Sequence, residues 1–142
     1  MSIAIMSCVL LVALTTLTHY EILRLLSFSL PELPIAPRAK LLVVMHTAFL
    51  AHGIQIFLYG FAFYLLARHV GSGALGESTQ PAFRDCMYFS AETYSSLGYG
   101  DILPKGPLRL LAGVEALNGL LLIGWSASYI YLSMERLWNE GN

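Results

Sequence analysis

The segment TYSSLGYGD, residues 93–101, joins hydroxyl side chains, two glycines and a closing acid. Gly98 and Gly100 can adopt positive φ values at little steric cost, so that successive backbone carbonyls can turn toward one line. A column of carbonyl oxygens, repeated by symmetry, can replace the hydration shell of a cation. The chemistry that this segment predicts is therefore ion coordination by backbone oxygens.

The histidines offer a second chemistry, a membrane enzyme with a bound metal, which their spacing disfavours. His46 and His52 are six residues apart, which turns them by about 240° around a helix, so they cannot hold a metal from one face. The chain contains no HxxxH or HExxH pair. We therefore predict no enzymatic activity and no cofactor, and these histidines, with His19, are candidates for a pH response.

The elements that position the glycine-rich segment must be membrane helices. The chain has 142 residues, of which 56% are hydrophobic and only 12% are charged, well below the charged fraction of a typical soluble domain. Its 8 basic and 9 acidic residues leave a net charge of −1, so there is no electrostatic footprint for nucleic acid. The predicted fold class is an all-α membrane protein.

Three apolar runs predict long helices. Residues 41–67 carry no formal charge, and this run is longer than the roughly 20 apolar residues that cross a bilayer. Residues 107–133 form a second run of sufficient length, apolar over most of it. Residues 1–30 lack the basic start and the cleavage site of a signal peptide, which favours a retained helix that either spans the membrane or lies along its inner face. Residues 31–40 contain three prolines and predict a stiff, extended connector.

Residues 82–95 predict a helix that is too short to cross the membrane. Backbone outside a helix is tolerated at membrane depth only where it is buried or lines a water-filled path. The order of span, short helix, glycine-rich segment and span therefore predicts a re-entrant hairpin within a pore domain of residues 41–133. A short cytoplasmic tail, residues 134–142, is expected to follow. If the hairpin enters from outside and the first helix spans, the N-terminus lies outside.

The stretch YFSAETYSSLGYGD, residues 88–101, resembles the pore helix and selectivity filter of the tetrameric potassium channels, whose filter reads TVGYG. Ser96 stands where that pattern has threonine, and Leu97 stands where it has valine. The remaining filter positions match, and they are Gly98, Tyr99, Gly100 and Asp101. The resemblance covers roughly residues 41–132, the span-pore-span module of the ion channel 2 family, and the chain resembles the small bacterial members of that family. The first thirty residues lie outside it.

This resemblance implies a homotetramer in the plasma or inner membrane, surrounded by lipid, with K+ ions in a central filter at residues 96–101. The residues implied to line the ion sites are Ser96, Leu97, Gly98, Tyr99 and Gly100. In some such channels, acids at the positions of Glu92 and Asp101 share a proton or a water behind the filter, so this pair is expected to set filter stability. Thr93 and Tyr94 are expected to support the filter from the pore helix. Gly119 lies where the inner helix of such channels often has a hinge.

Glu115 is the acid within the last apolar run, about 12 Å along a helix from its start. An intramembrane acid should face protein or water. We expect a structural anchor behind the pore helix, near Thr93 or Tyr94, or against Tyr59 and Gln55. Small residues around it, such as Gly119, also allow helices to approach closely.

The leading functional prediction is passive, potassium-selective conduction through a tetrameric pore. The serine and leucine of SLGYGD favour an alternative, a weakly selective channel for monovalent cations, and a further alternative is an accessory membrane subunit of another channel. No span carries the repeated arginines of a voltage sensor, so the stimulus that opens the pore is left open.

Overall fold

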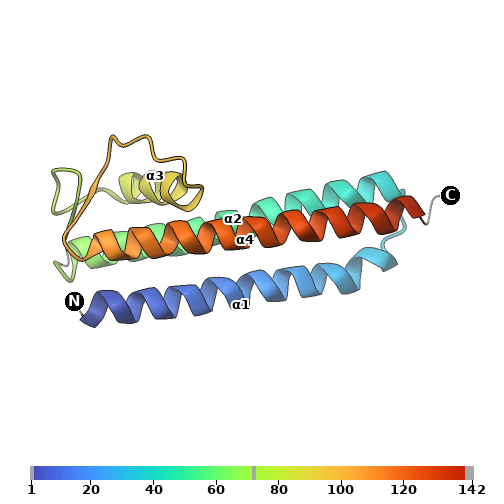
Figure 1. The fold of residues 1–142 in the computed structure, drawn as a ribbon, viewed down its shortest axis with the longest axis horizontal. Coiled ribbons are helices and arrows are strands. Elements are labelled where there is room, and N and C mark those ends of the chain that lie inside the picture. Colours follow the sequence, from blue (N-terminus) through green and yellow to red (C-terminus); the bar gives the residue numbers. More distant parts are fainter. Residues whose placement is uncertain (1, 72, 140–142) are drawn as a thin grey trace.

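The computed structural model describes residues 2–71 and 73–139. Three long helices lie side by side in it (Figure 1), namely α1 (Ser2–Glu32), α2 (Pro37–Arg68) and α4 (Leu108–Asn139). A short helix, α3 (Phe83–Tyr94), follows α2, and two strands of two residues each, β1 (Ala74–Leu75) and β2 (Pro104–Lys105), pair antiparallel. The all-α prediction is confirmed.

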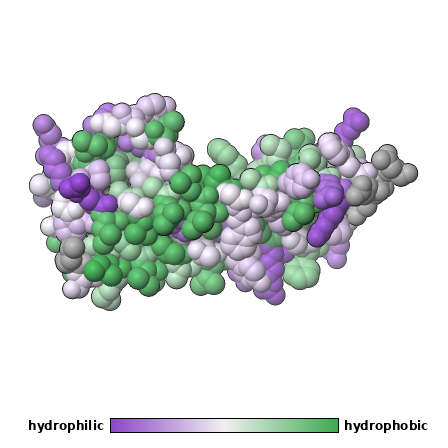
Figure 2. All heavy atoms as spheres, viewed as in Figure 1, coloured by the Kyte–Doolittle hydropathy of each residue, from purple (hydrophilic) through white to green (hydrophobic). Residues whose placement is uncertain are grey.

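Each of the three long helices is long and apolar enough to cross a membrane. A helix of 32 residues, the length of α2 and of α4, measures about 48 Å, which exceeds the hydrocarbon core of about 30 Å. Figure 2 shows hydrophobic side chains over the middle of one face and hydrophilic side chains gathered toward its two ends. This distribution is that of a molecule whose long axis crosses a bilayer.

The connector between the first two long helices is shorter than the sequence predicted. Helix α1 continues to Glu32 and α2 begins at Pro37, so the expectation of an extended chain from residue 31 to residue 40 was wrong at both ends. Pro37 occupies the start of a helix, where the N–H that proline lacks has no partner in any case. Pro31 lies in the last turn of α1, where its carbonyl accepts a hydrogen bond of 3.0 Å from Lys40 Nζ. This bond satisfies one of the free carbonyls of the helix end.

Helix α4 also continues beyond its expected end and covers residues 134–139 of the predicted tail. Residues 140–142 of that tail lie outside the described residues.

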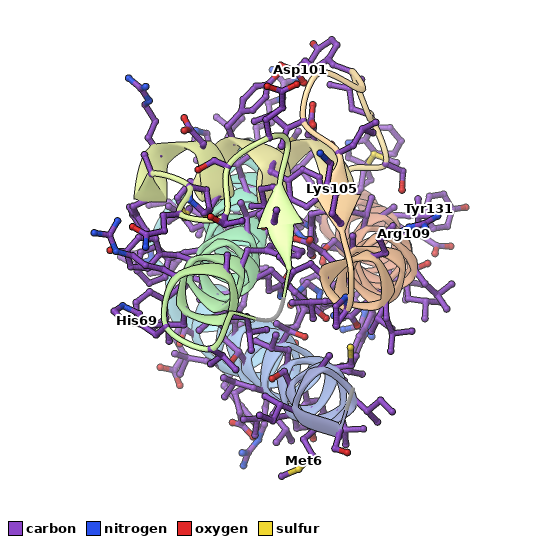
Figure 3. All side chains as sticks on the ribbon, turned by 90° about the vertical axis from the view of Figure 1, so that its left-hand side faces the viewer. Met6, His69, Asp101, Lys105, Arg109 and Tyr131 are labelled. Atoms are coloured by element: carbon purple, nitrogen blue, oxygen red, sulfur yellow. The ribbon has the colours of Figure 1, made fainter. Side chains whose placement is uncertain are left out.

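Helix α3 and helix α1 lie on opposite sides of the pair formed by α2 and α4 (Figures 1 and 3). The start of α1, the end of α2 and the start of α4 share the end of the molecule at which α3 lies, and α1 runs beside the other two long helices (Figure 1). This arrangement favours a spanning α1 over a helix along the inner face. The buried residues of α1 recur every three or four positions, which places them on one face, and they are Ala4, Cys8, Leu11, Thr15, His19, Leu23, Leu26 and Leu30.

The main core lies where α2, α3 and α4 meet. Phe63 of α2 packs edge-to-face on Phe89 of α3, with ring centroids 5.0 Å apart, and Leu111 of α4 is fully buried beside them. Gly60 of α2 lets α3 come close, because a Cβ at this position would meet Met87. Between helices in lipid, such close packing takes the place of the hydrophobic effect, and it fixes the position of α3.

Candidate functional site

The glycine-rich segment belongs to a hairpin whose two ends return to the same end of the molecule. The β1–β2 pairing, with Ala74 opposite Lys105, ties the stretch that follows α2 to the stretch that precedes α4. The amide of Gly76 also donates to the carbonyl of Leu103, at 2.9 Å. Seen from this end in Figure 3, Asp101 lies at the side of the molecule opposite Met6 of α1. The base of the hairpin is thus held by backbone hydrogen bonds, and its tip is presented away from α1.

Amides of the segment are bound to the end of α3. The N–H groups of Leu97 and Gly98 donate to the carbonyl of Glu92, at 2.9 and 3.3 Å, and the N–H of Ser96 donates to the carbonyl of Thr93, at 3.0 Å. These carbonyls are among those that a helix leaves free at its C-terminus. The position of α3 therefore sets the position of the segment that follows it.

Positive φ angles occur at every second residue from Ser96 to Gly100. Ser96 has φ of 57°, Gly98 of 55° and Gly100 of 81°. A Cβ at either glycine would meet nothing within 4 Å in this chain, so the backbone conformation, rather than lack of space, requires glycine there. The sequence indicated this conformation for the two glycines only. Ser96 also adopts it, although the left-handed region costs a residue with a Cβ roughly 1–2 kcal/mol.

The side chains of the segment are largely uncovered within one chain. Leu97 is 59% exposed and Tyr99 is 70% exposed. If this segment lines ion sites, as the sequence predicts, it does so on a surface that a single chain leaves exposed.

Glu92 supports the segment with its side chain as well as with its carbonyl. It is 4% exposed, and its Oε2 accepts a hydrogen bond of 3.3 Å from the amide of Tyr99. Asp101 is exposed, and its Oδ1 accepts from the amide of Ile102, at 3.1 Å. The hydrogen bonds of these two carboxylates thus go to different backbone groups, and the expected sharing between them stays a prediction.

Glu115 lies behind α3, on the side expected from the sequence, but its partner is a residue that the sequence did not indicate. It is fully buried, and its Oε1 lies 2.5 Å from Ser90 Oγ, which is itself 2.9 Å from the carbonyl of Ile56 in α2. A hydroxyl has one hydrogen and a carbonyl only accepts. Both contacts are satisfied when Ser90 donates to Ile56 and Glu115, as a neutral carboxylic acid, donates to Ser90. Glu115 then links α4, α3 and α2.

Tyr94, the last residue of α3, is held on two sides. Its hydroxyl donates to Oε1 of Gln55 and lies 2.9 Å from Nδ1 of His52, both in α2. Its carbonyl lies against Gly119 of α4, where an added Cβ would overlap it. Close approach therefore accounts for this glycine, which lies inside a continuous α4, and its role as a hinge stays a prediction.

Comparison with known proteins places the hairpin in a family. The sequence model of the family described as ion channel matches residues 51–136, from the middle of α2 to the last turn of α4. The chain is also similar to the inward rectifier potassium channel Kirbac3.1 of Paramagnetospirillum magnetotacticum, with 35% identity over 98 residues, which make up 68% of this chain and 33% of that protein. The chain thus corresponds to about a third of the length of this relative. No solved structure matches the chain significantly.

The matched region contains the end of α2, the whole hairpin and α4, and it makes up more than half of the chain. The three long apolar helices agree with a protein that crosses the membrane several times. The chain therefore belongs to the ion channel family and is a multi-pass membrane protein.

Proposed function

We propose that the protein conducts K+ passively through a pore formed by four copies of the chain, with residues 96–100 as the selectivity filter. The observation that carries the proposal is the alternation of positive φ angles at Ser96, Gly98 and Gly100, in a segment whose amides bind the end of α3. Amides directed toward α3 leave the carbonyls free to bind an ion. Similarity to a potassium channel supports K+ as that ion.

Assembly follows from the number of ligands that an ion requires. One chain supplies one segment, whereas replacing a hydration shell requires a ring of carbonyls. The exposed side chains of Leu97 and Tyr99 are then covered by neighbouring copies, and four copies correspond to the channels that the sequence resembles. In this assembly Glu92, Thr93 and Tyr94 hold the filter from α3, and Asp101 lies at its outer mouth.

The weakly selective cation channel remains a second candidate because of two residues. Ser96 keeps the hydroxyl of threonine but lacks its methyl group, and Leu97 lacks the β-branching of valine, which makes this part of the backbone less stiff. A filter that holds its shape less firmly discriminates less between K+ and Na+.

Recordings from the purified protein in planar bilayers test these proposals. With K+ on one side and Na+ on the other, a reversal potential near that of K+ supports the selective pore, and a reversal near zero supports the weakly selective one. An accessory subunit would give no current alone and would not purify as a tetramer.

A matched pair of substitutions tests the filter itself. Gly98→Ala places a Cβ at φ 55° in the filter, and Gly76→Ala places one at φ 62° in the loop, with free space around both. Both substitutions cause comparable backbone strain. We expect only Gly98→Ala to abolish the current; equal effects would contradict the assignment of the filter.

A further inference from the structure

Helix α1 lies outside the region that the ion channel family matches, yet its buried face carries two polar side chains. Thr15 and His19 are each fully buried, and their spacing of four residues places them on the same side of the helix. A polar group inside an apolar interior is costly unless it is hydrogen-bonded. Simple anchoring in lipid gives no reason for these residues.

Thr15 belongs to a layer of neutral groups. Asn118 Nδ2 of α4 donates to Thr15 Oγ1, at 2.8 Å, and lies 3.1 Å from the hydroxyl of Tyr59 in α2. Thr15 itself donates to the carbonyl of Leu11, at 2.7 Å. This layer joins the three long helices and contains no group that titrates near neutral pH.

His19, one turn further along α1, begins a chain of hydrogen bonds that ends at α3. Gln55 Nε2 of α2 lies 2.9 Å from His19 Nδ1, and Ser126 Oγ of α4 lies 3.2 Å from His19 Nε2. The other end of the same amide, Gln55 Oε1, accepts from the hydroxyl of Tyr94. One glutamine therefore connects α1 directly to the residue at which α3 ends and from which the filter continues.

The direction of these hydrogen bonds defines the protonation state of His19. An amide nitrogen only donates, so Nδ1 of His19 accepts and carries no proton, and Nε2–H donates to Ser126. A second proton on the ring would place an N–H of His19 against an N–H of Gln55. Rotating the amide by half a turn would relieve that contact, but it would turn the amide nitrogen toward Tyr94 and remove the hydrogen bond from the tyrosine hydroxyl to Gln55 Oε1, leaving Nδ1 of His52, 2.9 Å away, as the other partner of that hydroxyl. Protonation of His19 thus changes the contact that holds Tyr94.

The titratable groups around His19 come from each neighbouring helix. On α2, the ring of His52 lies 5.4 Å from that of His19, and Nδ1 of His52 lies 2.9 Å from the hydroxyl of Tyr94 in α3.

On α4, the side chains next to His19 are Ser126 and Trp125, whose ring is 5.4 Å away. The acid of this helix, Glu115, is hydrogen-bonded to Ser90 and not to His19. On α1 itself, Glu21 pairs with Arg24 at the surface. Among the described residues no carboxylate is hydrogen-bonded to His19 that would compensate a positive charge there.

We propose that His19 is a positioning residue of the pore, which holds the end of α3 in its conducting position while its ring is neutral, so that acid reduces the current. The first helix is then a working part of the channel and not an added anchor. The current used to test this rests on the proposed function, but the inference does not require that the current be selective for K+.

The test compares the conductance of purified channels in planar bilayers at about pH 8 and about pH 5 on both sides, the range over which histidine changes its charge. We expect a several-fold fall for the wild type and a much smaller fall for His19→Gln, which is neutral throughout. The matched control is His46→Gln, since His46 is exposed and, within the described part of the chain, its side chain is hydrogen-bonded only to a carbonyl of its own helix, that of Leu42. An equal fall in His19→Gln and the wild type would overturn the proposal.

Gln55→Glu provides a second variant with the opposite chemistry. A carboxylate accepts from Tyr94 and from a protonated His19 at once, so the contact survives in acid, and we expect the fall in current to be lost here as well. An unchanged fall in a correctly assembled Gln55→Glu tetramer would also contradict the proposal.

A measurement without current separates this inference from the proposed function. Nitrogen NMR of ring-labelled protein, assigned by difference from His19→Gln, should find Nε2 protonated and Nδ1 unprotonated at neutral pH. The reverse tautomer would overturn the inference even in a channel that proves selective. Reversal potentials at neutral pH, in contrast, test only the proposed function.

Discussion

Replacing Gly119 by alanine adds one methyl group at the point where α4 passes the end of α3. The added Cβ would overlap the carbonyl oxygen of Tyr94 and lie 3.1 Å from Cγ of the same residue. A backbone carbonyl cannot rotate away as the end of a flexible side chain can. Either α4 or the end of α3 must therefore move.

The size of the effect follows from two opposing terms. Alanine in a helix interior is about 1 kcal/mol more favourable than glycine, whereas overpacking a well-packed contact costs about 1–3 kcal/mol. Gly124→Ala in the same helix and Gly53→Ala in α2 receive only the first term, because a Cβ at either position meets nothing within 4 Å in the chain. We expect Gly119→Ala to be about 1–3 kcal/mol less stable than these two controls.

Thermal unfolding in detergent and bilayer recording are the two assays. Movement of Tyr94 also displaces the carbonyls of Glu92 and Thr93, which bind the amides of the proposed filter, so the current through Gly119→Ala should fall while that through the controls persists. If Gly119→Ala were as stable as Gly124→Ala and conducted like it, close approach would not be the reason for this glycine. Equal stability with altered opening would instead favour the hinge.

Substitutions at three further positions test the polar contacts of single side chains. Glu115→Gln keeps a donor for Ser90, so its free energy of unfolding should lie within about 1 kcal/mol of that of the wild type. Glu115→Leu should lower the free energy of unfolding by about 1–3 kcal/mol, measured by thermal unfolding. The reverse order of stability would contradict a neutral acid at this position. Glu92→Gln keeps an acceptor for the amide of Tyr99 and should retain the current, whereas Glu92→Ala should lose most of the current. Equal currents in the two variants would argue against support of residues 96–100 by the Glu92 side chain. Thr15→Val removes the hydrogen bonds of the Thr15 hydroxyl from Asn118 and to the carbonyl of Leu11, and should cost about 1–3 kcal/mol without altering the pH dependence of the current.

The helices and the re-entrant segment could be predicted because the membrane leaves few alternatives. A run of about 20 apolar residues must be a helix there, and α3, from Phe83 to Tyr94, lies inside the range expected for a helix too short to cross. The prolines misled at the connector. The rule against proline in helix interiors does not apply to a first position, such as that of Pro37, and α1 continues one residue past Pro31 in spite of that rule.

The contacts of the buried acid could be predicted only in part. The rise of 1.5 Å per residue gives the depth of Glu115 in the last span, and depth alone indicated a place behind α3. The partner, Ser90, depends on how far α4 is rotated about its own axis against α3, which is decided by close approaches such as that of Gly119 to Tyr94. The rotation of one helix against another cannot be predicted from the sequence pattern of either helix alone.

The conformation of Ser96 could not be predicted, because local preference opposes it. A residue with a Cβ enters the left-handed region only where surrounding contacts outweigh the strain. Here the amides of Ser96 and of the two following residues all bind carbonyls at the end of α3, and these bonds are available together only if the chain turns sharply at this point. The strain is thus a consequence of docking this segment on the end of α3.

The sequence contains an indication of the role of α1 that an average of hydropathy does not reveal. Averaged over a window, Thr15 and His19 disappear among apolar neighbours, but they continue the three- and four-residue spacing of the buried positions that precede them. Their partners, Gln55 and Asn118, lie within the region shared with the ion channel family. Without α1, these two buried amides would each lose a partner inside an apolar environment, where an unpaired polar group is costly. The polar residues on both sides of the contact therefore depend on each other, and α1 is part of the same packed structure as α2 and α4, although the family pattern does not include it.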